Sequence, residues 1–200
     1  MIYHYCPNCG SSIEIREIER RARAYCPNCQ TIHYEQLKIG AGAIIEKTGN
    51  LLLIQRTIEP FKGCWNLPAG YAEVDESPLE TARREVWEET GLEVRITDLV
   101  NVYFFNDDPR GNGILIVYNC QMVGGTLEER EEGVNPTYFD PTRLPVNLAG
   151  GGHDQAVHAW RERTSHLSER GAATPGGSLG QVRDLVETAS APGHKKAVLT

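Results

Sequence analysis

The chain has 200 residues, of which 40% are hydrophobic and 24% are charged, and its formal net charge is −7. This length can bury one hydrophobic core and carry a small accessory module, and the negative charge argues against broad affinity for nucleic acid phosphates. The opening MIYHYCPNCG lacks the pattern of a signal peptide, and no apolar run reaches the ~18 residues that span a bilayer. We therefore expect a cytoplasmic protein without a membrane partner.

Four of the six cysteines stand in two CPNC motifs. Cys6 and Cys9 form the first motif, and Cys26 and Cys29 form the second. Two C-x2-C pairs at this separation are typical of a zinc ribbon, in which four thiolates hold one structural Zn²⁺. The alternative is a pair of disulfides, which would suit a secreted chain. We expect a zinc site with no position left for water.

Between the two motifs, Ile13, Ile15 and Ile18 alternate with polar residues, which predicts the short hairpin of a ribbon over residues 1–35. A main domain over residues 36–163 then opens with a second hairpin. Its strands are expected in KIGAGAIIEK and in residues 51–55, with a turn at residues 48–50. Residues 57–77 are rich in Pro and Gly, which predicts a loop that passes close to another group near residues 68–70.

A helix is predicted after this loop. Ser77 is the expected N-cap, Pro78 stands at the first helical position, Glu80 completes a capping box, and Gly91 ends the helix. One apolar stripe is expected to face a sheet. It consists of Leu79, Ala82 and Val86.

Three carboxylates share the neighbouring face of this helix. Glu85, Glu88 and Glu89 lie at i, i+3 and i+4, where like charges repel one another. A divalent cation would compensate this repulsion, and carboxylate oxygens favour Mg or Mn, which complete their shells with phosphate oxygens. A solvated acidic face is the alternative interpretation.

The remaining sequence predicts three strands and one helix. The strands are expected in residues 92–105, 113–123 and 135–140, and the helix in residues 153–163, where Ala156, Val157 and Trp160 can pack. Residues 164–200 have the composition of a flexible tail, with at most a short helix in QVRDLVETA.

The segment from Gly70 to Leu92 reads G-x5-E-x7-R-E-V-x-E-E-x-G-L and is preceded by LPA. It resembles the signature of the Nudix hydrolases at every fixed position. The resemblance implies an α+β fold, the Nudix α/β/α sandwich with a mixed β-sheet, preceded here by the zinc ribbon. It also implies hydrolysis of a nucleoside diphosphate linked to another moiety.

By the same resemblance, the Ala69 carbonyl, Glu85 and Glu89 are the main ligands of Mg or Mn, and Glu88 is a ligand or the general base. The spacing of Glu76 and Arg84 predicts a charge-assisted bond that ties the loop to the helix.

A further glutamate outside the signature is expected to contribute to catalysis. We select Glu132, in EEREEGVNPTYF, as a metal ligand or base by resemblance to the family pattern. Asn135 stands where many relatives carry a second Glu, so the base stays open between Glu88 and Glu132. A solvated acidic loop is the alternative, and three neighbours compete with the selected residue: Glu128, Glu129 and Glu131.

Contacts to the substrate are also predicted. Arg56, at the end of a strand, is a candidate phosphate ligand or an ordinary surface arginine. Trp65 is the candidate for stacking on a base, although aromatic residues near strands more often belong to the core. The other aromatic candidates are Phe61, Tyr71, Tyr103 and Phe105.

Over about residues 3–145 the chain looks like shorter bacterial and plastid Nudix proteins with a ribbon, which are associated with ADP-ribose and FAD. NADH pyrophosphatases share the architecture, but their Ser-Gln-Pro-Trp-Pro-Phe-Pro run is absent here. Two alternatives stay open: hydrolysis of a nucleotide cap on RNA, and a nucleotide sensor that binds nucleic acid or protein through the ribbon. The first rests on Arg16, Arg20, Arg21 and Arg23. We expect a small nucleotide as the substrate, no general nucleic acid partner, and a homodimer.

Overall fold

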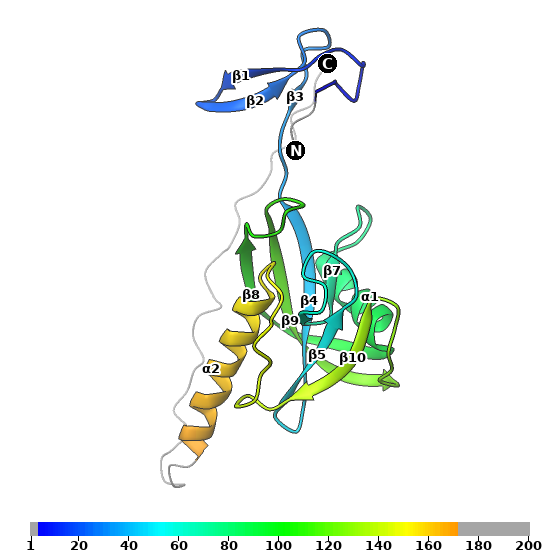
Figure 1. The fold of residues 1–200 in the computed structure, drawn as a ribbon, viewed down its shortest axis with the longest axis vertical. Coiled ribbons are helices and arrows are strands. Elements are labelled where there is room, and N and C mark those ends of the chain that lie inside the picture. Colours follow the sequence, from blue (N-terminus) through cyan, green and yellow to red (C-terminus); the bar gives the residue numbers. More distant parts are fainter. Residues whose placement is uncertain (1–3, 172–200) are drawn as a thin grey trace, which may run out of the picture.

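The computed structural model describes residues 4–171, with side chains described through residue 165. The N-terminal module is a three-stranded antiparallel sheet in the order β1-β2-β3. Its strands are β1 (Glu14–Ile18), β2 (Arg21–Tyr25) and β3 (Ile32–His33). Figure 1 shows this module at one end of the molecule, connected to the main domain through the segment that follows β3.

The main domain is built on a seven-stranded sheet in the order β10-β5-β4-β9-β8, with β6 paired to β5 and β7 paired to β4. The strands are β4 (Lys38–Lys47), β5 (Asn50–Arg56), β6 (Trp65–Asn66), β7 (Ala69–Tyr71), β8 (Leu92–Phe105), β9 (Gly113–Gly125) and β10 (Gly133–Phe139). The β4–β9 pair is parallel and the other pairs are antiparallel, so the sheet is mixed.

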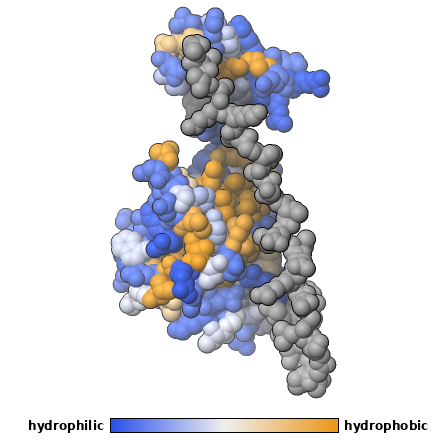
Figure 2. All heavy atoms as spheres, turned by 180° about the vertical axis from the view of Figure 1, so that it is seen from behind, coloured by the Kyte–Doolittle hydropathy of each residue, from blue (hydrophilic) through white to orange (hydrophobic). Residues whose placement is uncertain are grey.

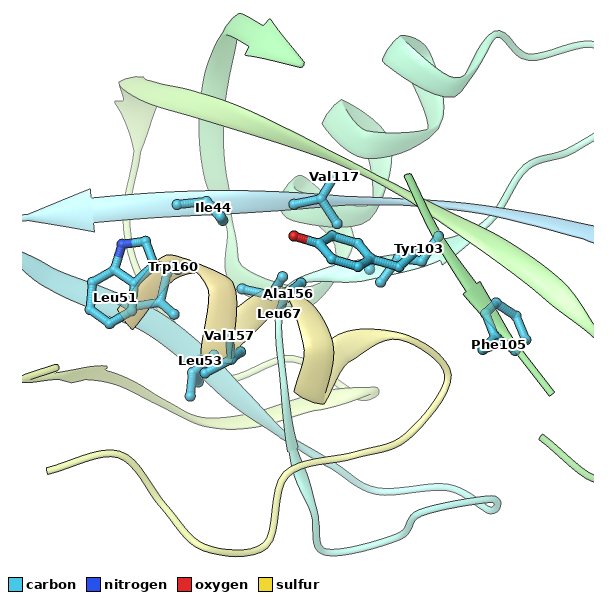
Figure 3. Packing of buried hydrophobic residues seen from close by; sticks show 12 residues of the cluster. Ile44, Leu51, Leu53, Leu67, Tyr103, Phe105, Val117, Ala156, Val157 and Trp160 are labelled. Carbon is cyan, nitrogen blue, oxygen red and sulfur yellow. The ribbon is translucent and has the colours of Figure 1, made fainter. Parts of the chain in front are cut away.

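Helices α1 (Pro78–Thr90) and α2 (His153–Gly171) cover opposite faces of this sheet (Figure 1). The alternation of side chains along β5 divides the core between them. Leu51 and Leu53 belong to the cluster that packs against α2, whereas Leu52 packs on the α1 side. Figure 3 shows Trp160 and Val157 of α2 against this first cluster. The expected α/β/α sandwich is confirmed.

The start of α1 follows its capping residues. The Glu80 backbone N–H donates to the Ser77 hydroxyl, and the Ser77 backbone N–H donates to Glu80 Oε2 at 2.8 Å. Gly91 ends the helix with φ of 73°. The apolar stripe is shorter than expected, because Ala82 and Val86 are fully buried while Leu79, in the first turn, is exposed.

Other boundaries differ from expectation for local reasons. The predicted loop contains β6 and β7, which have only two and three residues and therefore leave no periodic pattern. Helix α2 continues to Gly171 through residues that we place in the tail, because the chain meets no Pro or Gly before that glycine. The expectations for residues 172–200 lie outside the described residues.

Apolar side chains also reach the surface of the main domain, as Figure 2 shows on one face. On β8, the exposed apolar side chains include Leu99, Val102 and Phe104. No helix within residues 4–171 combines the length and apolar character needed to cross a membrane.

Candidate active site

Strand β7 brings the loop directly beneath α1. It pairs with β4, so that Ala41 lies opposite Gly70. The Ala69 backbone N–H donates a 2.8 Å hydrogen bond to Glu89 Oε2. A Cβ atom on Gly70 would lie 2.0 Å from Glu85 Oε1, so only glycine lets the loop approach this carboxylate. The predicted close approach at these residues is therefore present.

Arg84 joins the loop to three glutamates. Its Nε and one terminal nitrogen bind the two oxygens of Glu76, at 2.6 and 3.0 Å. The same terminal nitrogen donates to the Tyr71 carbonyl at 3.1 Å. The other terminal nitrogen contacts Glu85 at 2.7 Å and Glu88 at 2.9 Å. The predicted ion pair between Glu76 and Arg84 is present. Through its other terminal nitrogen, Arg84 also orients the carboxylates of Glu85 and Glu88.

Two carboxylates of the acidic face are buried. Glu85 is 8% exposed and Glu89 is 6% exposed. Burial raises the pKa of both groups, and the charge of Glu85 raises that of Glu89 further. The charge of Glu132 acts on both in the same direction. Burial is thus the main reason why the charged forms of both carboxylates are disfavoured in the absence of a further cation.

These groups face a cavity of about 160 Å³. Glu85, Glu89 and Glu132 line it together with Ala69 and Arg56. The structure therefore brings together most of the predicted metal ligands and the predicted phosphate contact. Glu88 is not among the lining residues, since Arg84 binds its half-exposed carboxylate.

The cluster fits an oxygen-liganded divalent cation. Glu85 and Glu89 each use one carboxylate oxygen for a protein donor, and among the described residues the second oxygen of each has no hydrogen-bond partner. Free oxygens of buried carboxylates beside a polar cavity suit Mg or Mn. Among the described residues the carboxylates do not form a group as tight as that of the four ribbon thiols.

The four ribbon thiols do converge. Their sulfur atoms all lie within 4.8 Å of one another, and no disulfide joins them. Hydrogen bonds from Ser11, first from its backbone N–H, lower the pKa of Cys9 to about 5. The Thr31 hydroxyl likewise lowers the pKa of Cys29. The Cys29 backbone N–H lowers the pKa of Cys26, but burial and hydrogen bonds with the thiols of Cys9 and Cys29 outweigh it and raise that pKa to about 11. The lowered pKa values of Cys9 and Cys29 favour the thiolate forms of these two residues, which are the forms that bind metals. Four sulfur ligands complete a tetrahedral shell, so the arrangement suits a structural zinc.

The aromatic candidates divide between the cavity and the core. Phe61 and Tyr71 line the cavity, as does Phe105, which is also part of the core. Trp65 stands elsewhere: its ring makes an edge-on contact with Phe139, with centroids 4.8 Å apart, and packs against the core. This placement gives no support to a substrate contact by Trp65.

Sequence reasoning missed three residues of the cavity lining: Asp108, Arg110 and His153. Asp108 accepts hydrogen bonds from the Tyr71 hydroxyl at 3.0 Å and from Arg110 at 2.7 Å. Asp108 and Arg110 fall in a turn-rich connection that pattern reading treats only as a loop. His153 also lines the cavity, at the first residue of α2. In the sequence, the only feature that marks His153 is the run of three glycines, residues 150–152, directly before it.

Comparison with known proteins agrees with this geometry. The NUDIX domain model matches residues 36–160, and the Nudix N-terminal model matches residues 4–35. A crystal structure of a NUDIX hydrolase from Nitrosomonas europaea superposes with a TM-score of 0.72 at 28% identity, covering 82% of this chain and 93% of that one. An ADP-ribose pyrophosphatase from Streptococcus suis gives a TM-score of 0.53 at 28% identity, covering 65% and 92%.

Two curated relatives indicate the range of the similarity. The ADP-ribose pyrophosphatase of Methanocaldococcus jannaschii is 41% identical over 108 residues, which are 54% of this chain and 64% of that protein. The NAD-capped RNA hydrolase NudC of Vibrio atlanticus is 27% identical over 144 residues, which are 70% of this chain and 51% of that protein. The chain thus spans between half and two thirds of the length of these two relatives.

The signature runs from the loop through α1 to the start of β8, its Glu85 and Glu89 line one cavity, and the family models match both parts of the chain. The chain belongs to the Nudix hydrolase family and carries the N-terminal module of that family.

Proposed function

We propose that this protein uses Mg or Mn to hydrolyse the pyrophosphate bond of a nucleoside diphosphate linked to another moiety, with ADP-ribose or FAD as the substrate. The observation that carries the proposal is the cavity in which Glu85, Glu89 and Glu132 lie with Arg56. The match to the Methanocaldococcus enzyme supports ADP-ribose within this class.

Each residue then has a defined task. Glu85 and Glu89 hold the cations, and Ala69 offers its carbonyl as a neutral ligand. Divalent cations held there would offset the charge of the diphosphate and lower the pKa of a water molecule toward neutrality. Arg56 binds a phosphate oxygen from the same cavity.

The structure favours Glu132 over Glu88 as the general base. Glu132 lines the cavity, and among the described residues no hydrogen bond or ion pair engages its carboxylate. Glu88 is bound by Arg84 at 2.9 Å and lies outside the cavity lining. A base must reach the attacking water, and the place of Glu132 in the cavity lining supports its proposal as the base.

Hydrolysis of NAD-capped RNA is the second candidate, because the alignment with NudC covers 70% of this chain. The ribbon surface gives this candidate limited support. Arg16 and Arg23 stack on Tyr25 and Tyr34, respectively, and Glu14 and Glu19 pair with the same arginines. Turnover of free nucleotides without affinity for RNA would favour the small-molecule enzyme.

A turnover screen tests the proposal. The substrates are ADP-ribose, FAD, NADH, nucleoside diphosphate sugars, dinucleoside polyphosphates and NAD-capped RNA, each with Mg or Mn. Glu89→Gln should reduce turnover about a hundred-fold or more, because it removes one charged ligand. Glu162→Gln, an exposed change on α2, is the matched control. An active Glu89→Gln enzyme would reject the ligand assignment.

A further inference from the structure

One part of the cavity wall is formed by the start of α2 and the glycines before it. Gly150, Gly151 and His153 line the cavity there. Gly151 and Gly152 have φ of 69° and 88°, and a Cβ on Gly152 would lie 3.2 Å from the Tyr103 side chain. This backbone packs closely on β8 and thereby fixes the position of His153. None of the catalytic tasks described above uses this wall.

His153 is a buried polar residue with one unpaired ring nitrogen among the residues that the structure describes. It is 8% exposed, and its Nδ1 is buried with no hydrogen-bond partner among the described residues. A proton on that nitrogen would be a buried donor without an acceptor, which is costly, so the proton belongs on Nε2. Burial, and to a smaller extent the charge of Arg56, lower the pKa of His153 to about 3. The side chain therefore enters the cavity wall as a neutral imidazole with one N–H donor.

Arg56 connects this wall to the metal site. Its charge acts on both Glu89 and His153, so the guanidinium lies within electrostatic range of both. A diphosphate held by the glutamates and Arg56 therefore places the groups attached to it near His153.

The charged groups near this wall are already paired with protein partners. The carboxylate of Asp107 accepts the Gly151 N–H at 3.0 and 3.2 Å and so occupies the positive end of α2. The Asp108 carboxylate lines the cavity, although Arg110 pairs with it. A neutral oxygen, such as a sugar hydroxyl, meets His153 without repulsion from these acids.

We propose that His153 is a specificity-determining residue that donates a hydrogen bond to a ribose hydroxyl of the substrate. This inference rests on the proposed function. The hydroxyl belongs either to the sugar linked through the diphosphate or to the nucleoside. In both cases, a substrate that lacks this hydroxyl leaves the Nε2–H of His153 without a hydrogen-bond acceptor.

The test measures kcat and KM for three substrates with wild type, His153→Phe and His153→Gln. The substrates are ADP-ribose, the methyl ester of ADP, which lacks the linked sugar, and an ADP-ribose analogue built on 2′,3′-dideoxyadenosine. His158→Phe is the matched control, because His158 is exposed on the same helix. Thermal melting establishes that each variant is folded, and His153→Ala replaces the Phe variant if that variant does not fold.

For ADP-ribose, we expect kcat/KM of His153→Phe to be about ten-fold or more below that of wild type, mainly because KM rises. For one of the two truncated substrates, kcat/KM of the variant should equal that of wild type. The spared substrate identifies the sugar that His153 contacts. His153→Gln, which keeps an N–H donor near the position of Nε2, should recover part of the loss. Equal losses on all three substrates, or no loss on ADP-ribose, would overturn the role of His153. A wild-type enzyme inactive on all three would instead count against the proposed function.

Discussion

Arg84 and Glu76 form a two-pronged ion pair that joins α1 to the preceding loop, with N···O distances of 2.6 and 3.0 Å. The fork of the guanidinium matches the two carboxylate oxygens, so the pair fixes direction as well as distance. Because Arg84 also binds Glu85, Glu88 and the Tyr71 carbonyl, the position of the acidic face depends on it.

Arg84→Lys should therefore impair catalysis although the positive charge remains. An ammonium group cannot bind both oxygens of Glu76 in a fork and reach Glu85 as well. We expect kcat/KM to fall about ten-fold or more, with a loss of stability of roughly 1–3 kcal/mol. Arg83→Lys, at the exposed neighbouring position, is the control and should change neither quantity. Similar behaviour of the two variants in kinetics and urea unfolding would refute this role of Arg84.

The same ion pair predicts a pH-dependent contribution to stability. The hydrogen bond from Arg84 is the main cause that lowers the pKa of Glu76, from 4.5 to about 2. A lowered pKa in the folded state contributes stability above pH 4.5, and this contribution disappears as the pH falls toward 2. The difference in unfolding free energy between wild type and Glu76→Gln should accordingly be largest near pH 6 and shrink below pH 4.5. Chemical denaturation at several pH values measures it, and a constant difference would contradict the assigned cause.

Gly70→Ala tests the close approach of the loop to α1. The added methyl group would overlap Glu85 Oε1 at 2.0 Å, so the carboxylate or the loop must move. We expect a loss of about ten-fold or more in turnover, because a displacement of about 1 Å at Glu85, a proposed metal ligand, is enough for such an effect. At Gly124 the nearest atom to an added Cβ is the end of the exposed Glu93 side chain, at 2.7 Å. Gly124→Ala should therefore be tolerated, and a Gly70→Ala enzyme of equal activity would show that the loop has room to adjust.

The ribbon should contain zinc. Elemental analysis of protein prepared without chelator is expected to give about one zinc per chain. Cys29→Ser should bring this value close to zero, whereas Cys64→Ser, at a thiol outside the cluster, should leave it unchanged. A metal-free protein whose four cysteines resist alkylation until reduction would establish disulfides instead.

The sequence predicted the parts of this molecule that local chemistry determines. Ser77 and Glu80 define the start of α1, the two CPNC motifs predict the thiol cluster, and the regular spacing from Gly70 to Leu92 predicts the acidic face. In each case residues close in sequence, or at a known spacing, share one element.

The part of the cavity lining that contains Asp108 and His153 could not be predicted in the same way. Asp108, in the connection between β8 and β9, and His153, at the start of α2, line the same cavity as the glutamates although they are far from them in sequence. Trp65 illustrates the reverse difficulty. Its ring could have faced a ligand or the core, and the pairing of β6 with β5 sets it beside Phe139.

The central claim is that the carboxylates of α1 hold divalent cations beside the scissile diphosphate. Crystals grown with Mn²⁺ and a non-hydrolysable analogue of ADP-ribose test it most directly, through anomalous scattering from manganese. We predict manganese peaks within about 2.0–2.4 Å of oxygens from Glu85 and Glu89, with the diphosphate of the analogue bound to the same ions. A map in which the analogue is bound while those carboxylates carry no manganese would contradict the claim.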